Sequence, residues 1–290
     1  MRACWPTCSV PEPTADPATP RACVAPGSGW PGDLADASTP VAHDAGQVAA
    51  LAEGAPALRE LDARISVCRA CPRLVDWREH IALTRRAAFA EEQYWGRPVT
   101  GFGDASPTIA ILGLAPAANG GNRTGRVFTG DPSGDWLFAS LHRVGLASQA
   151  TSTSAGDGMR LNRTRILAAV RCAPPQNKPT VQERDRCAPW LHAELAMLMP
   201  SLRVLVALGA FAWQTGISAL KAMGLDAGAA RGTRFGHAAQ MSWGPVTVLG
   251  SYHPSQRNTS TRRLTHEMLD DVLAHAALLG SVTRIERSDG

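Results

Sequence analysis

Four short apolar runs divide this chain and constrain its fold more than any other feature. They are TIAILGLA (108–115), TRILAAV (164–170), RVLVALG (203–209) and VTVLGSY (246–252). Runs rich in Val, Ile and Leu without polar alternation are typical of strands buried on both faces of a parallel sheet. An amphipathic, helix-like segment follows each run. This alternation predicts an α/β fold, a three-layer sandwich with a central four-stranded parallel sheet flanked by helices.

Three unusual loops follow the expected strands, at 113–131, 171–180 and 252–260. In open parallel sheets, ligands bind in the crevice outside the carboxyl ends of the strands. We therefore expect these three loops to converge on one site.

The first loop, GLAPAANGGNRTGRVFTGD (113–131), carries neither a Walker lysine motif nor a dinucleotide-binding glycine pattern. It places an aromatic residue, Phe128, just before the next expected helix. Two interpretations stay open: a surface loop with a buried anchor, or a pocket whose backbone wraps a flat ligand with Phe128 as its stacking face. Asp131 precedes Pro132, which is an ordinary pattern for a helix cap.

Four of the seven cysteines fall into two spaced pairs, Cys68 with Cys71 and Cys172 with Cys187. Such pairs suit one tetrahedral metal ion or a cubane iron–sulfur cluster, because C-x2-C brings two thiolates together. Zinc is the second choice, and four unrelated buried cysteines are the third. A group held by these pairs would fix the loop near residue 172 in a structural or DNA-positioning role.

The third loop begins GSYHPSQRNTSTRRLT (250–265). His253 and Pro254 end a strand, and hydroxyls, amides and arginines follow. This mixture is suited to binding a phosphate backbone.

Residues 1–50 are rich in proline, glycine and alanine and show no hydrophobic period. We expect them to form a disordered extension, with residues 51–290 as a single domain. No apolar run there suits a signal peptide, and none in the chain approaches the roughly 18 residues of a membrane span. The expected location is therefore the cytoplasm, where Cys4, Cys8 and Cys23 would be free thiols.

The loop at 113–131, RCAPPQNKP (171–179), YHPSQRNT (252–259) and the two cysteine pairs together resemble the uracil-DNA glycosylase superfamily, specifically family 5, the type B enzymes with an iron–sulfur cluster. The similarity runs from about residue 60 to about residue 275. It implies a monomeric enzyme that flips uracil, and other deaminated or damaged bases such as hypoxanthine, out of double-stranded nucleoid DNA and hydrolyses the N-glycosidic bond. It also implies one glycosylase domain with a 4Fe-4S cluster held by Cys68, Cys71, Cys172 and Cys187.

The resemblance further implies roles for individual residues. Phe128 would stack on the extruded base, and His253 would donate a hydrogen bond to it as it becomes anionic. Asp131 would lie next to the attacking water, with Asn177 as a polar partner of the base or the water. The backbone that reads the base edge would be that of Gly113, Leu114, Ala115 and Pro116. The expected DNA contacts are Asn122, Arg123, Ser255, Gln256, Arg257 and Asn258.

Ala115 departs from the better-known family 1 pattern, in which an aspartate before the proline handles the water. Gln256 or Arg257 is the expected wedge that fills the gap left by the flipped base. A non-catalytic iron–sulfur protein that binds DNA damage is the competing hypothesis. A small-nucleotide hydrolase is disfavoured because the sequence has neither a Walker motif nor a metal-binding carboxylate cluster.

Overall fold

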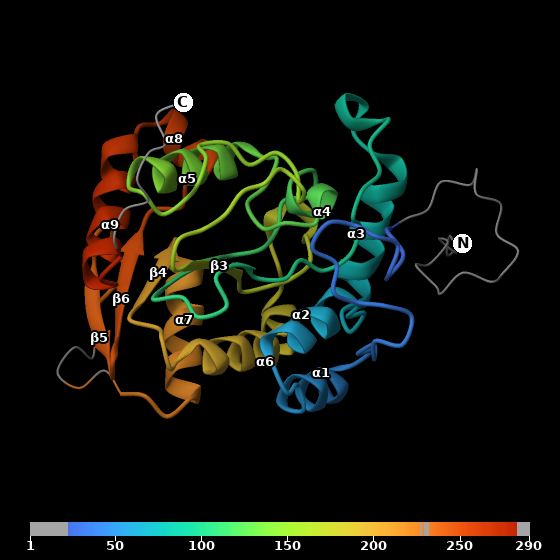
Figure 1. The fold of residues 1–290 in the computed structure, drawn as a ribbon, viewed down its shortest axis with the longest axis horizontal. Helices are drawn as coiled ribbons and strands as arrows, with labels where there is room; N and C mark the ends of the chain where they lie inside the picture. The colour runs from blue at the N-terminus through green and yellow to red at the C-terminus, as the bar shows by residue number, and fades with distance from the viewer. Residues whose placement is uncertain (1–22, 227, 229–231, 283–290) are drawn as a thin grey trace, which may run out of the picture.

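Six strands form one sheet at the centre of the molecule (Figure 1). The computed structural model describes residues 23–226, 228 and 232–282. The strand order is β1-β3-β2-β4-β6-β5. The strands are β1 (Phe102–Gly103), β2 (Ile109–Gly113), β3 (Thr164–Ala168), β4 (Val204–Leu208), β5 (Gln240–Trp243) and β6 (Val246–Ser251).

The four predicted apolar runs are the inner strands β2, β3, β4 and β6, and their neighbours pair in parallel. The edge strands β1 and β5 pair antiparallel with β3 and β6. The sheet is therefore mixed and six-stranded, and the prediction of a four-stranded parallel sheet is wrong about its edges. Two residues of β1 are too few to give a pattern, and β5 alternates exposed and buried residues as an edge strand does.

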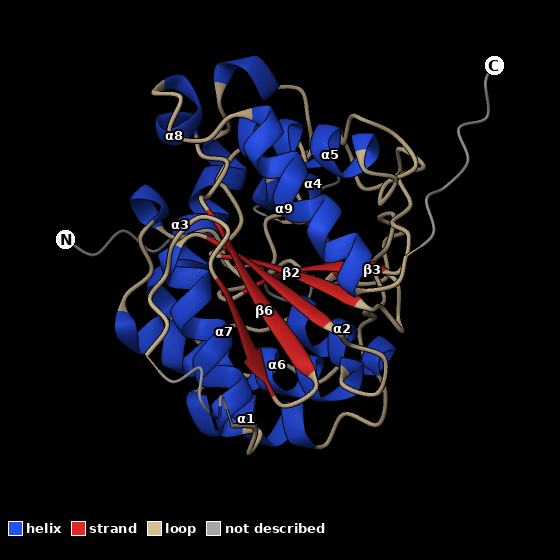
Figure 2. Ribbon diagram, turned by 90° about the vertical axis from the view of Figure 1, so that its left-hand side faces the viewer, coloured by secondary structure: helices blue, strands red, loops and turns tan. Residues whose placement is uncertain are grey.

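Helices cover both faces of this sheet (Figure 2). On one face, α5 (Pro132–Arg143) and α9 (His266–Leu279) pack against alternate strand residues such as Ile111 and Val206. On the other face, α6 (Val181–Leu198) and α7 (Ala210–Ala222) pack against the intervening residues such as Leu112 and Leu205. Because strand side chains alternate between faces, the continuous apolar runs supply both cores.

Three helices come from the first third of the chain; the first two lie beside α6 and the third beside the short helix α4, Gly121–Thr124 (Figure 1). These are α1 (Ala45–Glu53), α2 (Leu58–Ser66) and α3 (Pro72–Thr84). The remaining short helices are η1 (Ala87–Phe89), η2 (Pro175–Asn177) and α8 (Gln256–Ser260). No helix in the described ranges is long and apolar enough to cross a membrane.

Residues 23–50 pack on the domain, which contradicts the expected disordered extension for this part of residues 1–50. Val24 is buried and its amide donates to the Trp95 carbonyl at 3.0 Å. Asp33 forms a buried ion pair with Arg97 at 2.7 Å. Sequence patterning misses this segment because isolated small apolar residues and one ion pair hold it, without a hydrophobic period.

The remaining part of the expected extension, residues 1–22, lies outside the described residues, and so do Cys4 and Cys8. Cys23 is disulfide-bonded, so the prediction of a free thiol is wrong at this position.

Candidate active site

The loop after β2 is held in place by the segment that precedes the sheet. The Trp95 amide donates to the Arg123 carbonyl at 2.9 Å, and the Gly96 amide donates to the Asn122 carbonyl at 3.0 Å. The hydroxyl of Tyr94, a buried residue, donates to Asn119 Oδ1 at 2.9 Å. The loop is therefore an ordered wall of the sheet's carboxyl edge. None of residues 113–131 is exposed, which argues against a surface loop with a buried anchor.

Phe128 and His253 come together at this edge, so two of the three loops expected to converge do so. The edge of the Phe128 ring lies against β2, since a Cβ on Gly113 would lie 2.6 Å from Phe128 Cε2 and 2.7 Å from Cζ. The ring centroids of Phe128 and His253 are 5.8 Å apart. Phe128 is 8% exposed and adopts a left-handed φ of 54°. Strained backbone of this kind persists only where the surroundings fix it, and it often marks functional sites.

His253 follows β6 and is partly buried. Burial lowers the pKa of His253 to about 4, so its imidazole is neutral at pH 7. The His253 carbonyl accepts from Asn258 Nδ2 at 2.9 Å, and the neighbouring Tyr252 amide donates to His237 Nδ1 at 3.2 Å. These bonds fix the turn that presents the ring.

The two carboxylate oxygens of Asp131 have different neighbours. Oδ1 accepts from the amides of Ser133 and Gly134 at 3.0 and 3.1 Å, which is the helix cap expected from the sequence. Oδ2 lies on the other side, against Gly120, where a Cβ would meet it at 2.2 Å. Burial raises the pKa of Asp131, and the two amide hydrogen bonds oppose that shift. One oxygen therefore holds the helix, and the other is left for a second role.

Among the residues that follow β2, some backbone groups are hydrogen-bonded and others are not. The carbonyls of Gly113 and Leu114 accept from the amides of Ala169 and Val170, which extends the pairing with β3. Within the described residues, Ala115 makes no backbone hydrogen bond. Pro116 packs against Gly121, where a Cβ would lie 2.8 Å from Pro116 Cβ.

Asn122 and Arg123 lie inside the protein, so the structure contradicts their expected DNA contacts. Asn122 is 1% exposed and donates to the Arg78 carbonyl at 3.1 Å. Arg123 pairs with Glu92 and stacks over Phe89 at 4.0 Å. Both side chains stabilise the conformation of the loop. The sequence alone does not distinguish such buried polar residues from polar residues on the surface.

The other expected DNA residues lie on and before the short helix α8. Gln256 and Arg257 are exposed, and Ser255 is partly buried at the helix start. Asn258 instead holds the His253 carbonyl. Asn177 is exposed in η2 with a left-handed φ of 56°, and no contact joins it to Phe128 or Asp131 within the described residues.

The four paired cysteines line one cavity behind the same edge. Cys68 follows α2, Cys71 precedes α3, Cys172 follows β3, and Cys187 lies in α6. Ala115 packs against the small cluster formed around Cys172, so this cavity adjoins the loop after β2. The cavity brings together two cysteine pairs about 100 residues apart in sequence, as their spacing predicts.

The cysteine cavity is apolar apart from arginines. Burial raises the pKa of the Cys71 thiol to about 12, and Arg186 opposes this shift. Burial also raises the pKa values of Cys172 and Cys187. Arg78 Nη1 donates to Cys172 Sγ at 2.9 Å. Sequence reasoning missed Arg78, Tyr94 and Asn119, because single polar residues in helices or before strands carry no motif of their own.

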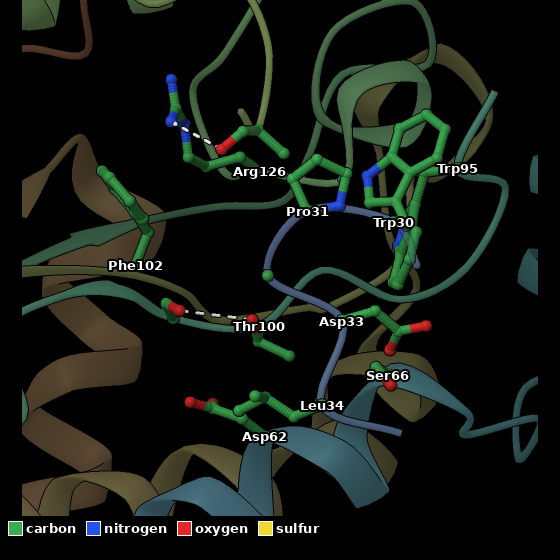
Figure 3. Close-up of a pocket in the computed structure, with 14 residues that line it drawn as sticks. Trp30, Pro31, Asp33, Leu34, Asp62, Ser66, Trp95, Thr100, Phe102 and Arg126 are labelled. Carbon is green, nitrogen blue, oxygen red and sulfur yellow. Dashed lines mark hydrogen bonds between the residues drawn. The ribbon is translucent and has the colours of Figure 1, made fainter. Parts of the chain in front are cut away.

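A second cavity lies under the N-terminal segment (Figure 3) and takes no part in this site. Its walls include Trp30, Asp33, Trp95 and Phe102. Phe128, Asp131 and His253 do not line it. Its acidic groups are already paired with arginines, Asp33 with Arg97 for example.

Comparison with known proteins identifies the family of this chain. Residues 100–277 match the family model of the Uracil DNA glycosylase superfamily. A Type-5 uracil-DNA glycosylase of Mycobacterium bovis is 55% identical over 90% of this chain and 96% of that protein. Proteins with the same name from Thermus thermophilus and Pyrobaculum aerophilum are 48% and 44% identical over 75% and 74% of this chain, and over 96% and 89% of their own. The chain therefore belongs to the uracil-DNA glycosylase superfamily, and within it to the type-5 enzymes.

Proposed function

We propose that this protein is a DNA repair enzyme that hydrolyses the N-glycosidic bond of uracil in double-stranded DNA and leaves an abasic site. The observation that carries the proposal is the meeting of Phe128 and His253 at the carboxyl edge of the parallel strands, with Asp131 in the same loop. The names of the similar proteins support the same activity.

The target nucleotide must leave the base stack before the bond can be reached, at a cost of a few kcal/mol. That cost is lower for a mispaired base such as uracil opposite guanine. Phe128 then provides a stacking face that is fixed by its contact with Gly113. The free amide of Ala115 is placed in the same loop to read the edge of the base.

His253 stabilises the leaving base. As the glycosidic bond breaks, the base takes up negative charge, and a donor fixed beforehand in a buried site stabilises it strongly. The lowered pKa keeps the imidazole neutral, so it acts by donating one hydrogen bond and is not a proton source.

Asp131 positions the attacking water through Oδ2, while Oδ1 stays bound to the amides of α5. This division lets one carboxylate cap a helix and serve the reaction at once. Asn177 remains a proposed partner of the base or the water, contributed by the exposed loop at 171–180.

Cys68, Cys71, Cys172 and Cys187 would hold a 4Fe-4S cluster. Among the described residues, no three His, Cys, Asp or Glu side chains converge on a single ion. Four thiols in two spaced pairs around one apolar cavity suit a cubane cluster, with zinc as the second choice. The cluster supplies structural cross-linking here: its four ligands would tie α2, α3, the loop after β3 and α6 together.

The exposed side chains of α8, Gln256 and Arg257, would contact DNA, and one of them would fill the gap left by the flipped base. The pocket formed by an aromatic face and backbone groups also supports activity on hypoxanthine. Such a pocket makes specific contacts with few substituents of the base.

The test is base release from a labelled duplex with a single uracil opposite guanine, with hypoxanthine opposite thymine in parallel, scored by alkaline cleavage. Cleavage at uracil is the expected result, and cleavage at hypoxanthine would establish the broader specificity. Tight binding with cleavage at neither base would favour a non-catalytic damage-binding protein.

A further inference from the structure

Two arginines are buried beside the cysteine cavity with part of their hydrogen-bonding capacity unused. Arg78 in α3 and Arg171 after β3 are each 1% exposed. Within the described residues, Arg78 Nε and Arg171 Nε and Nη1 have no hydrogen-bond partner. The indole Nε1 of Trp190, which lines the cavity, is also unpartnered. Buried donors of this kind are costly, so a group of them indicates an acceptor that the protein itself does not supply.

The positions of these groups identify the acceptor. Arg171 lines the cysteine cavity, and Arg78 Nη1 already donates to Cys172 Sγ at 2.9 Å. A third arginine, Arg186, lines the same cavity and donates to the Ala70 carbonyl at 2.8 Å. The three come from separate elements and meet at the four thiols.

The nearby carboxylates neutralise only part of the arginine charge, and one of them, Glu194, pairs with Arg171 itself. Glu79 pairs with Arg69 at 2.5 Å and approaches Arg78 only to 3.8 Å. Glu194 is shared between Arg171 and Arg165. Positive charge therefore exceeds negative charge around the cavity. A cubane with four thiolate ligands carries net negative charge, which this excess would balance.

We propose that Arg78, Arg171 and Arg186 form a cationic cradle that donates N–H···S hydrogen bonds to the sulfur atoms of the cluster. The proposal rests on the 4Fe-4S cluster proposed above. Hydrogen bonds to sulfur and local charge set both the reduction potential and the retention of such clusters. Because reduction makes the cluster more negative, the cradle raises its reduction potential and slows the loss of iron.

The experiment compares iron-loaded wild type with Arg78→Gln, which removes one charge and the bond to Cys172. The readouts are the midpoint potential, followed by EPR in a redox titration, and the rate of iron release to a chelator. We expect Arg78→Gln to lower the potential and to release iron several-fold faster. Arg78→Lys, which keeps the charge, should recover part of the change in potential.

Arg73→Gln is the matched control. Arg73 lies in the same helix and carries the same charge, but its guanidinium pairs with Glu183, whereas that of Arg78 donates to Cys172 Sγ. Its potential and iron release should equal those of wild type. Arg186→Gln, at a partly exposed position, gives the second variant if Arg78→Gln does not fold, and it should shift both readouts in the same direction.

Wild-type values in both Arg78→Gln and Arg186→Gln, with iron and sulfide fully retained, would overturn the cradle and leave the glycosylase proposal intact. Wild-type protein without iron and sulfide would instead overturn the cluster itself.

Discussion

The candidate active site and the cysteine cavity are adjacent, and they differ in how their titratable groups are neutralised or hydrogen-bonded. At the edge, His253 is kept neutral by burial, and Asp131 has one oxygen satisfied by two amides. In the cavity, Arg78 and Arg171 are buried with unpartnered N–H groups. If the proposals above hold, the edge stabilises charge that develops only in the reaction, whereas the cavity stabilises the permanent charge of a bound cluster.

The largest effect should come from His253. His253→Ala removes the donor to the departing base, so the single-turnover rate of uracil release should fall on the order of 100-fold or more. Binding to a uracil-containing duplex, measured by fluorescence anisotropy, should persist. An unchanged rate would show that His253 takes no part in the reaction and would contradict the proposed role of this edge.

Removal of one cysteine tests the other region. Cys187→Ala should reduce bound iron strongly and lower the melting temperature by about 5 °C or more, because the proposed cluster would link α2, α3 and α6. Iron analysis and calorimetry measure the two effects. A variant that keeps full iron and wild-type melting would show that this cysteine holds no metal.

The pH dependence of stability tests whether His253 is neutral in the folded protein. Its pKa is about 4 in the folded protein and about 6.5 in the unfolded chain, so the unfolded state binds more protons between these values. Stability is therefore present above pH 6.5 and falls as the pH drops towards 4, by at most about 3 kcal/mol. Urea unfolding at pH 7 and pH 5 should show a smaller loss for His253→Ala than for wild type.

The smallest expected effects come from Arg257 and Arg123, which should separate DNA binding from stability. Arg257→Ala should reduce the salt dependence of DNA binding by about one unit in log–log slope without affecting stability. Arg123→Gln should lower stability and leave that slope unchanged, since Arg123 is buried against Glu92 and Phe89. The reverse pattern would restore the original expectation that Arg123 contacts DNA.

Sequence patterning predicted the inner strands and the convergence of the loops that carry Phe128 and His253. Apolar runs mark strands buried on two faces, and the loops that follow them share one edge. The edge strands, the packed segment 23–50 and the interior position of Asn122 depend on tertiary contacts. A polar side chain such as Asn122 looks the same in sequence whether it binds DNA or donates to the Arg78 carbonyl.

The most direct test of the account is single-turnover uracil release by Asp131→Asn beside Asp135→Asn. Asparagine preserves the capping oxygen at position 131, so the helix should stay folded while the carboxylate that orients water is lost. Asp135 lies in the same helix, is exposed and serves as the control. The account predicts a loss on the order of 100-fold for Asp131→Asn and a wild-type rate for Asp135→Asn. Equal rates for both variants and wild type would contradict it, and Asp131 would then be a helix cap alone.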